Sequence, residues 1–223
     1  MSRMWIVPIS TLIGVLAYRV ARRVADQFDQ ALQTARSQGL FETCRVDVIT
    51  CPSVVMVGLV AFTTCWWLER NGLGVEGLVY AAAATLLWLM AYVDGRTGIL
   101  PDAMTGIYLW IAIGCQISLA PDHLPDQTHC ITTLAAYLVP FLINMMFQKC
   151  RGIDALGIGD AKLMAGLAMW FGPLALGIIL LDAIRGFLCF AVLKFLTGRG
   201  FPKALPLGPF LAMSGNVWML MHV

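Results

Sequence analysis

The sequence predicts an all-α protein, a polytopic bundle of helices that crosses a membrane several times. Hydrophobic residues make up 59% of the chain and charged residues 13%, whereas an ordinary soluble domain has about 25% charged residues. The hydrophobic residues also form long blocks, and a helix needs about 20 mostly apolar residues to cross a bilayer. These observations exclude a water-soluble globule, and the net charge of +2 gives no reason to expect nucleic acid as a partner.

Eight apolar segments can be drawn along the chain, so we expect about eight transmembrane segments. The sixth is short for a complete crossing and is expected to be a half-span or a tilted helix buried in the protein. The first is followed by arginines and lacks a small-residue cleavage site, so we interpret it as a retained span and not as a signal peptide. The segments cover residues 4–20, 52–68, 74–93, 103–120, 130–147, 160–171, 174–196 and 205–222.

The positive charges predict how the chain is oriented in the bilayer. With the N-terminus outside, twelve of the 15 Lys and Arg residues fall in inner loops, and only Arg3 and Arg70 fall outside. Inner loops of membrane proteins are richer in Lys and Arg than outer loops. We therefore expect an N-terminus outside the cytoplasm.

The first inner loop is the one sizeable polar piece of the chain. Val24, Phe28 and Leu32 recur at helical spacing among charged residues, which predicts an amphipathic helix on the inner leaflet. We therefore expect a first span, a cytoplasmic amphipathic loop and a membrane core, over residues 1–21, 22–51 and 52–223.

Two aspartates stand at the predicted inner border of the membrane, Asp94 at the end of the third segment and Asp160 at the start of the sixth. Two carboxyl groups at one site share a proton, so one can activate water while the other donates to a carbonyl, as in an aspartic protease. The helix dipole favours the charge on Asp160 and the proton on Asp94. Structural interpretations stay open, because Asp160 could cap its helix and Asp94 could be a solvated acid paired with Arg96.

Two glycines precede Asp160 in the sequence Gly157-Ile158-Gly159-Asp160. A protease binds its substrate in an extended form, and glycine lets backbone approach a substrate strand closely and permits positive φ. A flexible turn between helices would use the same two glycines, so this motif alone does not decide.

Other acids have structural explanations. Asp182 and Arg185 are three residues apart in the seventh segment and are expected to pair and to face the bundle. Asp102 follows Pro101 at the start of the fourth segment, where it would cap the helix.

The cysteines give little support for a metal site. Cys44 and Cys51 are the two cysteines of the first inner loop, whereas a structural zinc site needs four ligands and usually includes a closely spaced pair. We expect no metal. The sequence also contains no serine nucleophile with a histidine partner, zincin helix or phosphate loop.

Three patches of the sequence occur in the same order as known family motifs. They are Asp94-Gly-Arg-Thr-Gly-Ile-Leu-Pro101-Asp102-Ala-Met-Thr105, Gly157-Ile-Gly-Asp160-Ala-Lys162-Leu163 and Leu205-Pro206-Leu-Gly208-Pro209-Phe210-Leu211. With them the chain resembles the type IV prepilin peptidases, a family of membrane aspartyl proteases with a G-x-G-D motif. The opening Gly14-Val-Leu-Ala-Tyr-Arg19 is also similar to the start of full-length members.

The resemblance implies a function, a substrate and a location. Asp94 and Asp160 would be the catalytic pair, and the substrate a prepilin or pseudopilin whose short basic leader is cut at the cytoplasmic face of a bacterial inner membrane. Residues expected to form the active-site loop or to contact the substrate are Gly157, Gly159, Lys162, Pro101 and Asp102.

The chain departs from the family pattern in its first inner loop. Many bacterial members carry two C-x-x-C pairs there and methylate the new N-terminus with S-adenosylmethionine. Because this loop has only Cys44 and Cys51, we expect neither zinc nor S-adenosylmethionine as a cofactor and no methyltransferase activity, as in shorter members.

Three other functions stay open at this point. A proton-coupled transporter could use the membrane aspartates as a relay. A non-catalytic component of a pilus or secretion machine would tolerate loss of either aspartate. Another G-x-G-D intramembrane protease would share the motif, although the Pro101-Asp102 and Pro206–Phe210 segments favour a prepilin peptidase.

Overall fold

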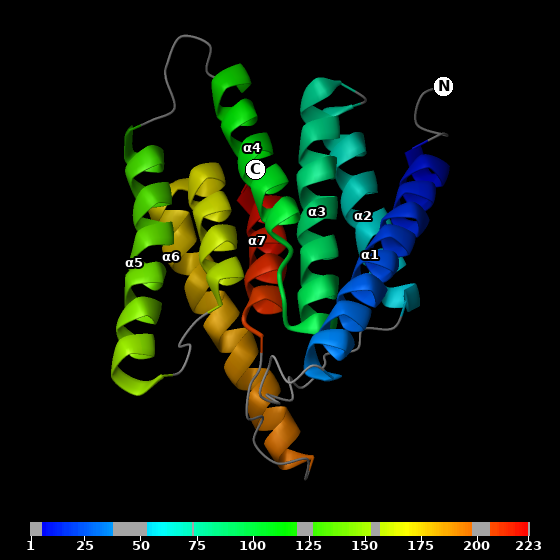
Figure 1. The fold of residues 1–223 in the computed structure, drawn as a ribbon. Coiled ribbons are helices and arrows are strands. Elements are labelled where there is room, and N and C mark those ends of the chain that lie inside the picture. Colours follow the sequence, from blue (N-terminus) through cyan, green and yellow to red (C-terminus); the bar gives the residue numbers. More distant parts are fainter. Residues whose placement is uncertain are drawn as a thin grey trace.

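A computed structural model describes residues 6–37, 53–72, 74–119, 127–152, 157–197 and 206–222 of the chain. Over these residues every regular element is a helix, which confirms the predicted all-α class. The helices, shown in Figure 1, are α1 (Ile6–Ser37), α2 (Ser53–Asn71), α3 (Val75–Thr97), α4 (Asp102–Leu119), α5 (Gln127–Arg151), α6 (Ile158–Leu196) and α7 (Gly208–His222).

The helices stand side by side, with α1 near one edge of the bundle, α5 at the other and α7 in the middle (Figure 1). α7 packs against both α3 and α6, and α6 also packs against α4 and α5. Apolar side chains without exposed surface fill the space between these helices, among them Leu87, Met90, Leu167 and Leu211. The core therefore lies around α7, where helices distant in sequence meet.

The outer surface is apolar as well. Large side chains such as Leu174 and Leu196 are more than two-thirds exposed, at 85% and 73%. α3, α5 and α6 are each long and apolar enough to cross a bilayer. An apolar exterior is what a lipid environment requires, and the expected number of about eight crossings stays a prediction.

α6 consists of two helical arms that meet at Gly172. This residue has φ 77° and ψ −175°, which are not helical values, and Pro173 follows it. The two arms run in opposite directions, so that the first climbs the bundle and the second descends it (Figure 1). The break falls between the expected segments 160–171 and 174–196, which therefore correspond to the two arms.

Polar side chains from α4 and α5 satisfy the backbone at this break. Gln116 Nε2 donates to the carbonyl oxygens of Met169 and Trp170 at 3.3 and 3.4 Å. His129 Nδ1 lies 3.0 Å from the Met169 carbonyl oxygen, and its ring covers Gly172. Because carbonyl groups at a helix end have no partner within the helix, these two side chains stabilise the reversal.

α1 is longer than the expected first span. We expected the span to end at residue 21 and a separate amphipathic helix to follow, but α1 continues unbroken to Ser37. No glycine or proline occurs between Val15 and Ser37, and the buried side of the span continues through Ala21 and Ala25. The helix therefore has no reason to end at the membrane border. The domain division itself stays a prediction, and residues 38–52, with Cys44 and Cys51, lie outside the described residues.

The break in α6 gives a first prediction. Gly172→Ala should lower the free energy of unfolding by about 1–3 kcal/mol, because alanine is strained at positive φ and its methyl group would lie 2.8 Å from His129 Nε2. Thermal unfolding in detergent measures the effect. The matched control is Gly177→Ala in the second arm, where nothing lies within 4 Å of the added carbon. Equal melting temperatures for the two variants would contradict the prediction.

Candidate active site

Asp94 and Asp160 meet at the first residue of α7. Asp94 lies in the last turn of α3 and Asp160 in the first turn of α6. A methyl group added to Gly208 would overlap Asp94 Oδ2 and lie 2.9 Å from Asp160 Oδ1. The two carboxyl groups, which are far apart in the sequence, therefore converge on one point, and only a glycine fits beside them.

Asp94 is a buried acid at the end of α3. Asp94 is 3% exposed, and its carboxyl oxygen Oδ2 has no hydrogen-bond partner among the described residues. Its carbonyl oxygen accepts a hydrogen bond of 2.7 Å from the Gly98 amide, and Gly98 ends α3 in the left-handed conformation with φ 68°. Since a buried polar atom normally finds a partner, this carboxyl oxygen is an exception among the described residues.

Arg96 does not pair with Asp94, so the interpretation of Asp94 as a solvated acid paired with Arg96 is wrong. Arg96 Nη2 lies 2.8 Å from Asp26 Oδ1, and Arg96 Nε lies 3.4 Å from Asp29 Oδ2. These ion pairs join the end of α3 to the extended part of α1. They hold the turn that carries Asp94 against a second helix.

Asp160 is half-buried and is not the cap of its helix. The residue in the capping position is Gly157, which forms no side-chain cap. Asp160 is the third residue of α6, and its side chain turns back toward Gly157, where an added carbon would lie 3.3 Å from Asp160 Oδ2. The alternative in which Asp160 serves only as a helix cap is therefore wrong for this structure.

The glycines of the G-x-G-D motif provide space. Neither Gly157 nor Gly159 has positive φ. These glycines are therefore not required for the left-handed conformation that we expected them to permit. A carbon added to Gly159 would lie 2.7 Å from Leu100 Cβ and 3.3 Å from the Leu100 carbonyl oxygen. Gly159 therefore lets the start of α6 contact the segment that follows α3, and this contact sets the separation of the two aspartates.

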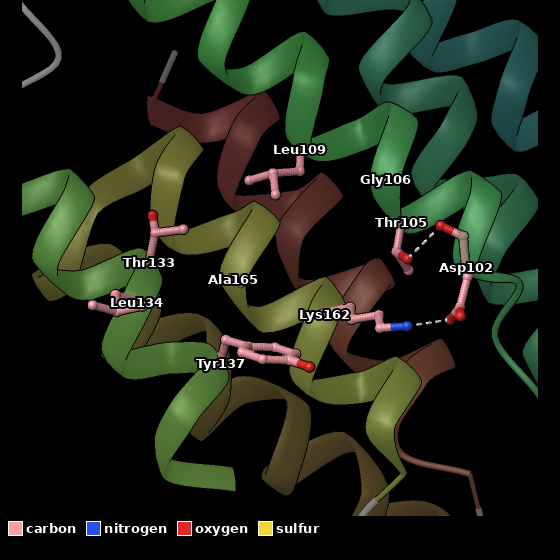
Figure 2. Close-up of a pocket in the computed structure, with 9 residues that line it drawn as sticks. All are labelled: Asp102, Thr105, Gly106, Leu109, Thr133, Leu134, Tyr137, Lys162 and Ala165. Carbon is pink, nitrogen blue, oxygen red and sulfur yellow. Dashed lines mark hydrogen bonds and ion pairs between the residues drawn. The ribbon is translucent and has the colours of Figure 1, made fainter. Parts of the chain in front are cut away.

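The other expected site residues, Pro101, Asp102 and Lys162, lie at or near the starts of α4 and α6. The Pro101 carbonyl oxygen accepts hydrogen bonds from the amides of Met104 and Thr105, at 3.0 and 3.3 Å, and thereby starts α4. Asp102 is the first residue of α4, and its Oδ1 lies 2.7 Å from Lys162 Nζ (Figure 2). Lys162 and Asp102 thus bridge the starts of α6 and α4 near the aspartates.

Gly208 is the residue of the site that our sequence reasoning did not single out. The signal was present in the third patch, Leu205-Pro206-Leu-Gly208-Pro209. Periodicity and spacing could not reveal that this glycine faces two aspartates contributed by other helices.

Asp182 and Arg185 do not extend the site. Asp182 Oδ1 and Arg185 Nη1 are 2.8 Å apart, which confirms the predicted pair. The expectation that the pair faces the bundle is wrong, because the two side chains are 48% and 74% exposed. The buried face of this arm is formed by Ile179, Ala183 and Ala191 instead.

The expectation of no metal stays a prediction. Among the described residues no group of three or more His, Cys, Asp or Glu side chains could hold a metal ion. Cys44 and Cys51 lie outside that part of the chain.

Comparison with known proteins identifies the family of the chain. A model of the type IV leader peptidase family matches residues 81–201, more than half of the chain, and the match includes Asp94 and Asp160. The chain belongs to the type IV leader peptidase family. No solved structure gives a significant match.

Several relatives in this family are each named prepilin leader peptidase/N-methyltransferase. The protein from Dickeya chrysanthemi is 30% identical over 173 residues, which cover 77% of this chain and 60% of the relative. The protein from Pectobacterium carotovorum subsp. carotovorum is 29% identical, over 83% of this chain and 66% of the relative. One from Burkholderia pseudomallei is 36% identical over 64% of this chain and 46% of the relative. The chain thus spans between about half and two-thirds of the length of these relatives.

The contact at Gly208 gives a second prediction. Gly208→Ala should lower leader-peptide cleavage by about 100-fold, because the methyl group displaces a carboxyl group and a shift of about 1 Å can cost that much. Cleavage of a prepilin in membranes, at matched enzyme levels, measures the effect. Gly58→Ala on α2, where the added carbon meets nothing within 4 Å, should keep wild-type activity. An active Gly208→Ala variant would show that the close contact is not required.

Proposed function

We propose that this chain is a membrane aspartyl endopeptidase that removes the basic leader peptide from type IV prepilin-like substrates at the cytoplasmic face of a bacterial inner membrane. The observation that carries the proposal is the convergence of Asp94 and Asp160 on Gly208, with Asp94 Oδ2 buried and unpartnered among the described residues. Membership of the type IV leader peptidase family supports the reaction class, and the names of the relatives support the substrate class.

The proposed mechanism uses the two aspartates as a pair that shares one proton. The charged carboxylate takes a proton from a water molecule, whose oxygen attacks the scissile carbonyl carbon. The protonated carboxyl group donates to the carbonyl oxygen. Proton transfer to the leaving nitrogen then breaks the peptide bond. Asp160 lies at a helix start and Asp94 at a helix end, so the helix dipoles favour Asp160 as the base and Asp94 as the acid.

The surroundings of the pair support a cytoplasmic site. Arg19, Arg22 and Arg23 are exposed on α1, and the same helix binds the end of α3 through Arg96. Positive charge concentrates on the inner side of membrane proteins. We therefore propose an N-terminus outside, eight crossings counted with both arms of α6, and the aspartates at the inner border.

The other functions fit the structure less well. A proton relay needs ionisable groups spread through the depth of the bilayer. Asp94 and Asp160 instead converge on one residue, Gly208, and Asp182 pairs with Arg185 on an exposed surface. A role as a non-catalytic component does not explain why two carboxyl groups converge on one residue. Another G-x-G-D protease would share the aspartates and differ in its substrate.

We further propose that the chain cleaves without methylating. The relatives are named as both peptidases and N-methyltransferases, and this chain has only Cys44 and Cys51 in the loop where many family members carry four cysteines. Neither zinc nor S-adenosylmethionine is part of the proposed reaction.

Replacing the aspartates tests the peptidase. Asp94→Asn and Asp160→Asn should each lower cleavage of a co-expressed prepilin by at least about 1,000-fold, because neither remaining carboxyl group can supply both proton transfers. Immunoblots of leader removal at matched membrane levels measure the effect. Asp182→Asn is the control, because this acid lies outside the site, and it should leave cleavage unchanged.

Retained cleavage in either aspartate variant would contradict the proposed pair. In that case the residue would be structural and the assembly-component function would have to be preferred.

The mass of the mature substrate tests the absence of methylation. After cleavage in cells, the new N-terminal peptide should have its unmodified mass, because we assign the chain no methyl-transfer activity. Mass spectrometry of the purified pilin measures this directly. A peptide heavier by one methyl group in cells whose only prepilin peptidase is this chain would overturn the prediction.

A further inference from the structure

The last turn of α3 is held from two sides by two different helices. On one side Asp94 is directed at Gly208, the first residue of α7. On the other side Arg96 is directed at α1, where its Nη2 lies 2.8 Å from Asp26 Oδ1 and its Nε lies 3.4 Å from Asp29 Oδ2. Successive residues of an α-helix point about 100° apart, so residues two positions apart leave nearly opposite sides of a turn. The turn that carries the proposed catalytic acid is therefore clamped between α1 and α7.

α1 gives a firm support to its side of the turn. The two carboxylates that bind Arg96 are three residues apart on one face of an unbroken helix. The first half of this helix packs closely on α2, because a carbon added to Gly14 would lie 2.9 Å from the Val57 carbonyl oxygen. Tyr18 of α1 also contacts Tyr92 of α3 edge to face, with ring centroids 5.7 Å apart. The carboxylates are thus fixed relative to the bundle.

The turn needs support because it is the end of a helix. The amide of Gly98, which donates to the Asp94 carbonyl oxygen at 2.7 Å, ends α3 in the left-handed conformation. The last carbonyl groups of a helix have no partners within it, and helix ends fray. Asp94 must nevertheless keep its place opposite Asp160, since a displacement of about 1 Å can lower a reaction rate by about 100-fold.

The Arg96 contacts differ from an ordinary surface ion pair. Exposed pairs of single charges contribute little to stability. Here one guanidinium group contacts two carboxylates of another helix, and the Arg96 side chain is 32% exposed. The Asp182–Arg185 pair, by contrast, lies within one helix, and the Arg185 side chain is 74% exposed. Arg96 is therefore placed to fix the relative position of α1 and the turn.

From these observations we propose that Arg96 is a positioning residue of the peptidase, whose ion pairs with α1 keep Asp94 opposite Asp160. This inference rests on the proposed function and deepens it. It makes α1 part of the catalytic apparatus, although the family model matches residues 81–201, which include Arg96 and do not include α1.

Steady-state cleavage of a purified prepilin by the purified full-length chain in liposomes tests the proposal. Arg96→Gln should lower kcat by about 10-fold and leave KM within about two-fold, because a reacting group loses its position and the substrate loses no contact. Arg96→Lys keeps a positive charge but not the planar fork, so it should recover part of the lost kcat. The matched control is Arg185→Gln, which removes the same group from an ion pair that is also 2.8 Å long and should leave both constants unchanged.

Removing the carboxylates of α1 tests whether Arg96 acts through them. The double variant Asp26→Asn, Asp29→Asn should lower kcat about as much as Arg96→Gln. The triple variant, with all three substitutions, should lower kcat no further, because the effects of groups that act as one unit do not add. Thermal unfolding of each variant in detergent should match that of Arg185→Gln, since the expected effect is one of position and not of folding.

The outcomes separate the two proposals. If the wild type cleaves prepilin but Arg96→Gln keeps the wild-type kcat or raises KM alone, the positioning proposal fails and the peptidase stands. Losses of kcat that add up in the triple variant, or that only follow the fraction of folded enzyme, would also overturn the positioning proposal. If the wild type does not cleave prepilin, both proposals fail.

Discussion

The contact between Gly208 and the two aspartates governs the rest of the structure. α3, α6 and α7 approach one another so closely at Gly208 that there is no space for one additional methyl group. A closely packed interior can maintain such short distances because its side chains interlock. Here the fully buried Leu87, Leu167 and Leu211 lie on the same three helices. The Arg96 ion pairs with Asp26 and Asp29 add α1 as a fourth support. The helix bundle is thus a frame that fixes two carboxyl groups.

The glycines near the aspartates show how a motif acts physically. Gly157, Gly159 and Gly208 all have φ outside the left-handed region, so their common property is the absence of a side chain. Gly159 admits Leu100, and Gly208 admits both carboxyl groups. The described glycines with positive φ lie elsewhere, after the ends of α2, α3 and α5 and at the reversal in α6. Space and conformational freedom are therefore separate uses of glycine in this chain.

Composition and hydrophobic blocks were enough to predict the helical class, the interruption near Gly172 and the position of Asp94 and Asp160 at helix ends. These properties depend on residues that are close together in the sequence, so the sequence alone can predict them. The continuation of α1 to Ser37, the pairing of Arg96 with Asp26 and Asp29, and the place of Gly208 were not predicted. Each depends on which distant segments become neighbours. The outward orientation of Asp182 and Arg185 depends likewise on which face of their arm the neighbouring helices cover.

The reversal in α6 also has a consequence for biogenesis. As one continuous helix its 39 residues would extend about 58 Å at 1.5 Å per residue, nearly twice the hydrocarbon thickness of about 30 Å. Gly172 folds this length into a hairpin with no connecting loop. The carbonyl groups of Met169 and Trp170 beside it are contacted by Gln116 and His129, from helices that precede α6 in the chain. The reversal is therefore stabilised only where α4 and α5 lie beside it, so these two helices are partners that the hairpin needs when it forms.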